Sequence, residues 1–269
     1  MPRVTHLTMI YLLTSFASPI SISHQRRIFE KNHIVQTNIQ KDTESMNTDL
    51  NTEHLTETPY LQFTKTPGEV EVATEKELVL KCEAIGIPPP VIEWAYNGDI
   101  IHVIHESNAV EKLYNIGLNT IENSVTASKM IVPCIINKNK AEYKCLASNG
   151  HQKLESTTTV VVKGNAKCSR NHSPPTISMW TDGRFERSGA TVQLFCRVNG
   201  NPQPNITWYN EENSELSDVK KYKVNELILQ SGDLIIYDTK WEDLGVYTCI
   251  ASNEYGHDRI VAFFYPTEP

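Results

Sequence analysis

Six cysteines carry the clearest chemistry in this sequence of 269 residues. Thiols at suitable spacing are oxidised to disulfide bonds in secretory compartments, and an even number of cysteines permits three bonds with no thiol left over. Six cysteines allow fifteen connectivities, so composition alone does not choose the pairs. The choice depends on the residues placed around each cysteine.

Other reactive groups are scattered and form no recognisable catalytic pattern. The sequence contains no Gly-x-Ser-x-Gly elbow, no phosphate-binding glycine loop and no His-Glu-x-x-His motif. His102 and His105 precede Glu106, but no third ligand stands nearby to complete a zinc site, so we expect exposed histidines in a loop or edge strand. We therefore predict no catalytic residues, no metal, no cofactor and no enzymatic activity.

A tryptophan and a tyrosine stand at fixed distances from the last two cysteines. Trp208 follows Cys196 by twelve residues, and Tyr247 precedes Cys249 by two. This spacing is typical of an immunoglobulin-type β-sandwich, in which a disulfide bond ties two sheets together, the tryptophan packs on the bond and the tyrosine hydroxyl binds backbone at a corner. We predict a Cys196–Cys249 bond with both aromatic residues in the core around it.

The same pattern occurs earlier in the chain, which indicates an internal repeat. Trp94 follows Cys82 by twelve residues, and Tyr143 precedes Cys145 by two. We therefore predict a Cys82–Cys145 bond inside a second core of the same kind. The first copy is about ten residues longer between its tryptophan and its tyrosine, and the extra residues fall within 97–124.

The E–F corner of the first copy departs from the pattern of the second. Asp243 and Gly245 suit the tight turn before strand F in the second copy, whereas Asn139 and Ala141 stand at the matching positions of the first. Asparagine can still serve a turn. We expect the first corner to be less regular within the same fold.

The repeat predicts the fold class and the order of the parts. The fold class is all-β, with two tandem immunoglobulin-like sandwiches of the I-set type. The predicted parts are a signal peptide at 1–23, a flexible polar leader at 24–58, domain 1 at 59–163, a linker at 164–174 and domain 2 at 175–269.

Two cysteines remain after these assignments. Cys134 lies late in or just after strand E of domain 1, and Cys168 lies in the linker. We predict a bond between them, which would clamp the linker to the base of domain 1. The alternative is two free thiols or an intermolecular bond.

The N-terminus and the overall charge indicate export and limit the partners. A charged start is followed by about ten mostly apolar residues, Leu7–Phe16, and then by small residues that suit cleavage between positions 17 and 23. No later apolar run is long enough to span a bilayer, and no lipid-anchor signal ends the chain. The net charge of -7 argues against nucleic acid as a partner. We expect a secreted, extracellular protein without membrane insertion.

Two glycosylation sequons fit that compartment. Asn171 begins one in the linker, although Pro174 follows it, and Asn205 begins the other at the entry to strand C of domain 2. The alternative at each position is an unmodified surface asparagine.

The last strand of domain 2, Arg259–Tyr265, is apolar from Ile260 onwards, so one of its faces should be apolar and outward. With Ile260, Ala262 and Phe264 in the core, the outward residues are Val261, Phe263 and Tyr265; the reverse arrangement is open. An outward aromatic face marks a contact with another protein or is covered by domain 1 or the linker.

The stretch Ile100–Ile104 raises the same question in domain 1, with Ile101 and Val103 as candidate contact residues. Trp241 in the E–F corner of domain 2 is expected to anchor the turn.

Several strings resemble one family in particular. Phe63–Pro67, Ser231–Ile236 and Lys240–Gly245, together with the repeat and its two additional cysteines, are similar to the insect neural/ectodermal development factor. The resemblance covers the chain from about Tyr60 to Pro266 and implies an ecdysone-inducible, secreted protein with two immunoglobulin domains.

That resemblance also implies a partner. The family binds insulin-like peptide hormones in extracellular fluid and restrains insulin signalling in growth, metabolism and development. No binding residue of the family maps onto a motif of this sequence. The alternative is a neural or ectodermal adhesion or guidance ligand that acts through its immunoglobulin domains.

Overall fold

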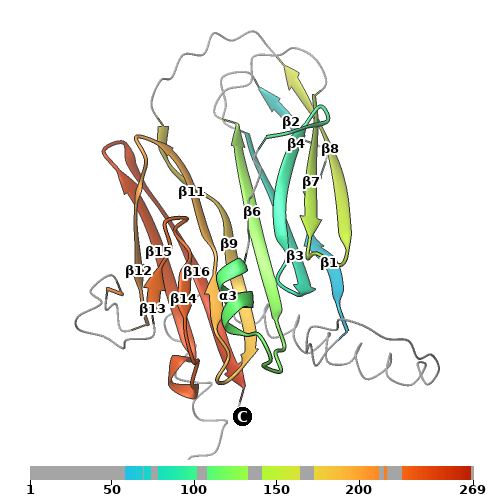
Figure 1. Ribbon diagram of the computed structural model, residues 1–269. Coiled ribbons are helices and arrows are strands. Elements are labelled where there is room, and N and C mark those ends of the chain that lie inside the picture. Colours follow the sequence, from blue (N-terminus) through green and yellow to red (C-terminus); the bar gives the residue numbers. More distant parts are fainter. Residues whose placement is uncertain are drawn as a thin grey trace, which may run out of the picture. The chain divides into compact units, whose positions relative to one another are not determined.

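The computed structural model describes residues 58–68, 70–73, 78–101, 108–132, 141–163, 173–211, 215–216 and 226–267. The structure is all-β with two sandwiches, as predicted (Figure 1). The elements of the first are β1 (Tyr60–Lys65), β2 (Val70–Ala73), β3 (Leu78–Ile87), β4 (Val91–Tyr96), β5 (Asp99–Ile100), α3 (Ala109–Tyr114), β6 (Asn123–Val132), β7 (Ala141–Ser148) and β8 (Lys153–Lys163). Those of the second are β9 (Ser173–Arg187), β10 (Val192–Leu194), β11 (Cys196–Asn201), β12 (Asn205–Tyr209), β13 (Glu226–Ile228), β14 (Leu234–Ile236), the 3-10 turn η1 (Trp241–Asp243), β15 (Gly245–Asn253) and β16 (Gly256–Thr267).

Alternation of apolar and polar residues determines which face of each strand is buried. In β3, Leu78, Leu80, Cys82 and Ala84 are buried, while the residues between them are exposed or half-buried. The period of two matches the pleat of a strand that lies between a core and solvent. The same rule holds along β7 and β16.

Both predicted disulfide bonds are present at the centre of the two cores. Cys82–Cys145 lies with Trp94 in the first core, and Cys196–Cys249 lies with Trp208 in the second. Each indole nitrogen donates a hydrogen bond, from Trp94 to the Ser128 hydroxyl at 2.9 Å and from Trp208 to the Gly232 carbonyl at 2.8 Å. Tyr143 and Tyr247 are also buried. Cys134 and Cys168 lie outside the described residues.

The two sandwiches share one sheet, which the internal repeat of the sequence did not predict. Its strand order is β1-β3-β6-β9-β16-β15-β12, with β11 attached to β9 as a branch. The junction is β6 against β9, which pair antiparallel from Asn123↔Phe185 to Ser128↔Met179. One sheet therefore extends from one immunoglobulin domain into the other, with a register shift between Val125 and Thr126 of β6 (Figure 1).

Side chains also cross this junction. Met179 and Phe195 belong to the second sandwich in sequence, yet both are buried in the core cluster of the first. The Ser128 hydroxyl accepts from Trp94 and donates to the Ser178 carbonyl at 2.6 Å. The two cores are therefore packed against each other through β6 and β9.

A short helix covers the junction from one side. α3 lies within the longer segment of domain 1, between β5 and β6, where ten extra residues were expected. Asn115, which follows α3, donates to the Thr191 carbonyl at 2.8 Å and accepts from the Thr191 N–H at 2.7 Å. The insertion thus binds domain 1 to the β10 region of domain 2.

Candidate functional site

The last strand, β16, presents one face to the core and one face outward. Ile260, Ala262 and Phe264 are buried in the second core, which resolves the two arrangements left open by the sequence. Val261 is 40% exposed, and Phe263 and Tyr265 are half-buried. The outward residues are therefore those predicted as contact residues.

Strand register extends this surface across the shared sheet. Tyr265 pairs with Phe185 of β9, and Phe263 pairs with Gly183 of β9 and with Val246 of β15. Paired residues on neighbouring strands lie on the same face. We call this surface the outward face; in β9, β15 and β16 it carries Phe185, Val246, Val261, Phe263 and Tyr265.

Aromatic rings gather at one end of the outward face. Phe185 stacks on Tyr265 with ring centroids 5.3 Å apart and planes 15° apart. Trp241 of η1 meets Tyr265 edge-on at 5.7 Å. With Phe263, these rings form what we call the aromatic end. Stacked and edge-on rings restrict one another, so the surface is ordered before any partner arrives.

The tyrosine corner holds Trp241 at this place. The Tyr247 hydroxyl donates to the Asp243 carbonyl at 3.0 Å, as predicted from the sequence. The Asp243 carboxylate accepts from the Lys240 N–H at 2.7 Å and so closes η1. Trp241 is therefore both a turn residue and a member of the aromatic end.

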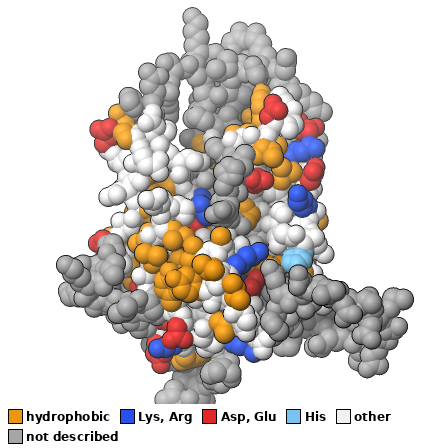
Figure 2. Space-filling model, in the orientation of Figure 1, with side chains coloured by type: hydrophobic (Ala, Val, Ile, Leu, Met, Phe, Trp, Pro, Cys, Tyr) orange, Lys and Arg blue, Asp and Glu red, His pale blue; other side chains and the backbone are white. Residues whose placement is uncertain are grey.

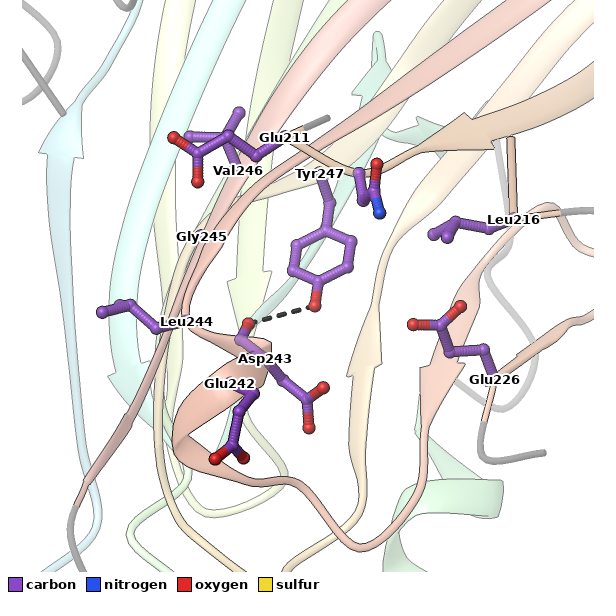
Figure 3. A pocket seen from close by; sticks show the side chains of 10 residues that line it. Glu211, Leu216, Glu226, Glu242, Asp243, Leu244, Gly245, Val246 and Tyr247 are labelled. Atoms are coloured by element: carbon purple, nitrogen blue, oxygen red, sulfur yellow. Dashed lines mark hydrogen bonds between the residues drawn. The ribbon is translucent and has the colours of Figure 1, made fainter. Parts of the chain in front are cut away.

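A cavity of about 310 Å³ lies beside this corner, and Figure 3 shows its lining. Glu211, Glu226, Glu242 and Asp243 contribute carboxylates, and Tyr247 points its ring between them. Burial, together with the nearby Asp243 and Glu226, raises the pKa of Tyr247, which keeps the phenol protonated and able to donate. Within the described part of the chain, no group of three His, Cys, Asp or Glu side chains is placed to hold a metal ion.

A second apolar surface lies on α3 and the turn after it. Leu113, Tyr114, Ile116 and Leu118 are 65%, 56%, 76% and 42% exposed. Tyr114 also meets Tyr237 edge-on at 4.8 Å. Figure 2 shows hydrophobic side chains gathered over α3 and the strands beside it. We call these five residues the helix patch.

The helix patch has one signal in the sequence. Apolar residues at 113, 114, 116 and 118 fall in the segment that domain 2 lacks, and α3 is only six residues long. Glu111, rather than an apolar residue, is the side chain of α3 that points into the protein. The polarity of this helix is therefore reversed, since it buries a carboxylate and exposes leucine and tyrosine.

Glu111 belongs to a buried ion cluster with Arg184 and Glu186 of β9. One Arg184 nitrogen, Nη2, donates to Glu111 at 2.6 Å and to Glu186 at 2.7 Å, and all three side chains are at most 1% exposed. Glu111 also accepts from the Gln193 N–H at 2.8 Å, and Glu186 accepts from the Ile121 N–H at 2.7 Å. The cluster joins α3, β9 and the start of β10 and so fixes the helix patch relative to the shared sheet.

Burial dominates the electrostatics of Glu111. Its pKa is raised to about 8, mainly by desolvation; the attraction of Arg184 opposes this rise, and the nearby Glu122 and Glu186 contribute to it. Two buried carboxylates thus face one guanidinium, and a proton on Glu111 relieves the excess negative charge.

The other predicted site residues fall in several places. Ile101, which follows β5, is 41% exposed and lies apart in sequence from the outward face. Asn205 is exposed at the start of β12. Val103, His102, His105, Asn139 and Asn171 lie outside the described residues.

The comparisons with known proteins agree with this architecture. The immunoglobulin I-set domain model matches residues 61–162 and 183–264. The protein zig-4 of Caenorhabditis elegans, a "Zwei Ig domain protein", is 37% identical over 70% of this chain and 72% of its own length. The neural/ectodermal development factor IMP-L2 of Drosophila melanogaster is 28% identical over 78% of each chain.

A solved structure extends the relation to three dimensions. The crystal structure of neural ectodermal development factor IMP-L2 matches with a TM-score of 0.62 at 27% identity, over 78% of this chain and 96% of that one. Among the described residues no helix is long and apolar enough to cross a membrane. The fold and the relatives indicate a non-enzymatic family with extracellular protein partners. The chain therefore belongs to the immunoglobulin I-set family and, within it, to the two-domain group that includes the neural/ectodermal development factor.

Proposed function

We propose that this protein is secreted and sequesters insulin-like peptide hormones, which antagonises insulin signalling. The relation to the neural/ectodermal development factor supports the class of partner, since the family that the sequence resembles binds such peptides. The observation that carries the proposal is the aromatic end, an ordered apolar surface on a sheet that spans both domains.

The chemistry of this surface suits a helical hormone with an apolar face. Tyr, Trp and Phe side chains are common anchors in protein interfaces because each supplies a large contact area with few rotatable bonds. Gly183 opposes Phe263 and adds no side chain, so no cross-strand side chain of β9 stands directly opposite the Phe263 ring. Docking here would cover the hormone surface that is otherwise presented to a receptor.

The direct test is isothermal titration calorimetry of the full secreted chain with a purified insulin-like peptide. We expect binding at micromolar protein. The double variant Phe263→Ala/Tyr265→Ala should weaken it by at least about tenfold, the loss typical of removing interface anchors. Both side chains are half-buried, so the thermal midpoint should change by only a few degrees.

Matched variants on the helix patch provide the control. Leu113→Ser/Ile116→Ser removes two exposed apolar residues away from the outward face and should leave hormone binding unchanged. Absence of binding heat for the unmodified protein contradicts sequestration. A large fall in the midpoint of the Phe263/Tyr265 variant with hormone binding intact would show that these rings are core residues.

The helix patch supports a second function, contact with another extracellular or cell-surface protein in adhesion or guidance. Its four residues on α3 and the following turn are each at least 42% exposed. A group of neighbouring apolar side chains with this exposure is typical of a protein-contact surface. This function predicts the opposite pattern, since Leu113→Ser/Ile116→Ser would abolish capture of the partner protein and Phe263→Ala/Tyr265→Ala would not. Cell-surface binding of the two variants on neural cells distinguishes the functions.

A further inference from the structure

The sequon Asn205-Ile206-Thr207 lies in β12, the last strand of the shared sheet (Figure 1). Trp208 is fully buried, and Ile206 packs against the second core. Because neighbouring residues of a strand point to opposite faces, Asn205 and Thr207 point away from the core. Asn205 is exposed, which leaves its amide nitrogen open to modification.

Register places Asn205 on the same face as the aromatic end. Asn205 pairs with Ser252 of β15, and Ser252 pairs with His257 of β16. His257 lies six residues before Phe263 and has the same orientation, since their separation is even. Asn205 therefore belongs to the outward face, at about 20 Å from Phe263 along the strands and about 10 Å across them.

The two ends of the outward face differ in chemistry. Asn205, Ser252 and His257 form an exposed polar row at one end, while rings occupy the other. A glycan is compatible with the polar end of the outward face, where it would cover polar side chains that solvent can hydrate. At the aromatic end a glycan would cover the rings proposed to bind the hormone.

We propose that Asn205 carries an N-linked glycan in the secreted protein, and that this glycan restricts docking on the outward face to the aromatic end. The modification of Asn205 is independent of the proposed function. The restriction of docking rests on the proposed function, because it concerns where the hormone binds.

Occupancy is tested by mass spectrometry of the full chain secreted from cultured cells. Release of glycans by an N-glycosidase in ¹⁸O-labelled water should mark Asn205 as labelled aspartate. Thr207→Ser should keep the modification, whereas Asn205→Gln and Thr207→Val should each remove it. An unmodified Asn205 peptide as the major species overturns the proposal.

Position is tested by moving a glycan to the other end. Val246→Asn completes a sequon with Thr248 beside Phe263 on the outward face. Its glycosylated form should bind an insulin-like peptide at least tenfold more weakly than Val246→Gln, which has a similar polar side chain and no sequon. Asn205→Gln should change the affinity less than twofold, because the native glycan lies away from the rings.

Arg259→Asn/Val261→Thr, with Arg259→Gln/Val261→Thr as its control, places a second sequon on β16, two residues after His257 and four before Phe263. Its glycan lies between the two ends of the outward face and should weaken hormone binding less than the glycan of Val246→Asn. Normal binding by the glycosylated Val246→Asn variant, or a tenfold effect of Asn205→Gln, overturns the restriction. An occupied Asn205 in a protein that binds no hormone leaves the modification standing and instead refutes the proposed function.

Discussion

Arg184 holds two carboxylates in a place that water does not reach. The guanidinium contacts Glu111 of α3 and Glu186 of its own strand, and all three side chains are essentially unexposed. A buried ion pair contributes little net stability compared with a well-packed apolar group, but removal of one partner leaves an uncompensated charge. Arg184 therefore adds little net stability when it is present, but its removal is expected to destabilise the protein strongly.

Arg184→Met is expected to lower the free energy of unfolding by about 3 to 5 kcal/mol, because the Glu186 carboxylate would remain buried without a cation. Urea unfolding followed by tryptophan fluorescence measures the change. Lys129→Met is the matched control, since Lys129 and Asp258 are 2.6 Å apart but remain 16% and 20% exposed. That control should cost about 1 kcal/mol or less. Equal losses for the two variants would contradict this account.

Glu111 should also make stability depend on pH. Its folded pKa of about 8 lies above the ordinary value of 4.5, so the folded state retains a proton that the unfolded state loses. The resulting stabilisation is complete below pH 4.5 and is lost as pH rises towards and through 8. The charged groups around Glu111 are Arg184, Glu186 and Glu122.

Glu111→Gln removes this titration and nearly preserves the shape of the side chain. The difference in unfolding free energy between the parent and the variant should therefore shift against the parent as pH rises from 5 to 8.5. Urea titrations at several pH values measure it. A difference that stays constant over this range would show that Glu111 is already ionised in the folded state.

At the scale of elements, the turn between β13 and β14 explains Gly232 and Asp233 within the string Ser231–Ile236. Gly232 has φ of +96°, and a Cβ there would lie 2.5 Å from the Cys196 carbonyl oxygen and 2.5 Å from Ile206 Cδ1. Next to it, Asp233 accepts from the Cys196 N–H at 3.0 Å and pairs with Arg197 at 2.6 Å. The turn thus docks on β11 through a glycine that permits close approach and an aspartate that binds the opposite backbone.

Gly232→Ala should be far more destabilising than Gly98→Ala. Gly98 has nearly the same φ, +97°, but no atom lies within 4 Å of a Cβ built there. Gly98→Ala should cost about 1 to 2 kcal/mol for the left-handed backbone alone. Gly232→Ala adds about 1 to 3 kcal/mol because backbone must move. Thermal unfolding of both variants measures the contrast, and similar midpoints would refute it.

At the scale of the molecule, the shared sheet makes the two immunoglobulin domains one cooperative structure. β6 and β9 pair over six register positions, Met179 and Phe195 enter the first core, and Glu111 of α3 accepts a hydrogen bond from Arg184 of the second domain. Two domains joined only by a linker would unfold separately. Here, loss of either core would expose the β6–β9 junction and the residues buried around it.

We therefore expect a single unfolding transition in differential scanning calorimetry, with the calorimetric and van't Hoff enthalpies equal. Arg184→Met should lower the temperature of that whole transition. Two resolved transitions, or a van't Hoff enthalpy near half the calorimetric one, would show that the domains unfold independently. The intact disulfide bonds do not interfere, because they persist throughout the scan.

Local spacing was enough to determine the internal structure of each sandwich. Cys196, Trp208, Tyr247 and Cys249 occupy the places that the pattern predicts, because a disulfide core requires these side chains at these distances along strands of known pleat. The alternation in β16 likewise indicated an apolar outward face, although the core-facing set was left open. These features depend on contacts within one repeat, which the sequence displays twice.

Only the tertiary structure decided how the repeats combine. β6 pairs with β9, and Glu111 of α3 contacts Arg184, although the residues in each contact are 50 or more positions apart in the sequence. The local pattern of apolar and polar residues predicts neither contact, nor the reversed polarity of α3. Backbone hydrogen-bonding groups differ little between residue types, so the sequence of a strand does not specify which other strand pairs with its edge. The sequence by itself therefore determined the two cores, and the fold determined the common sheet, the aromatic end assembled from β9, η1 and β16, and the helix patch.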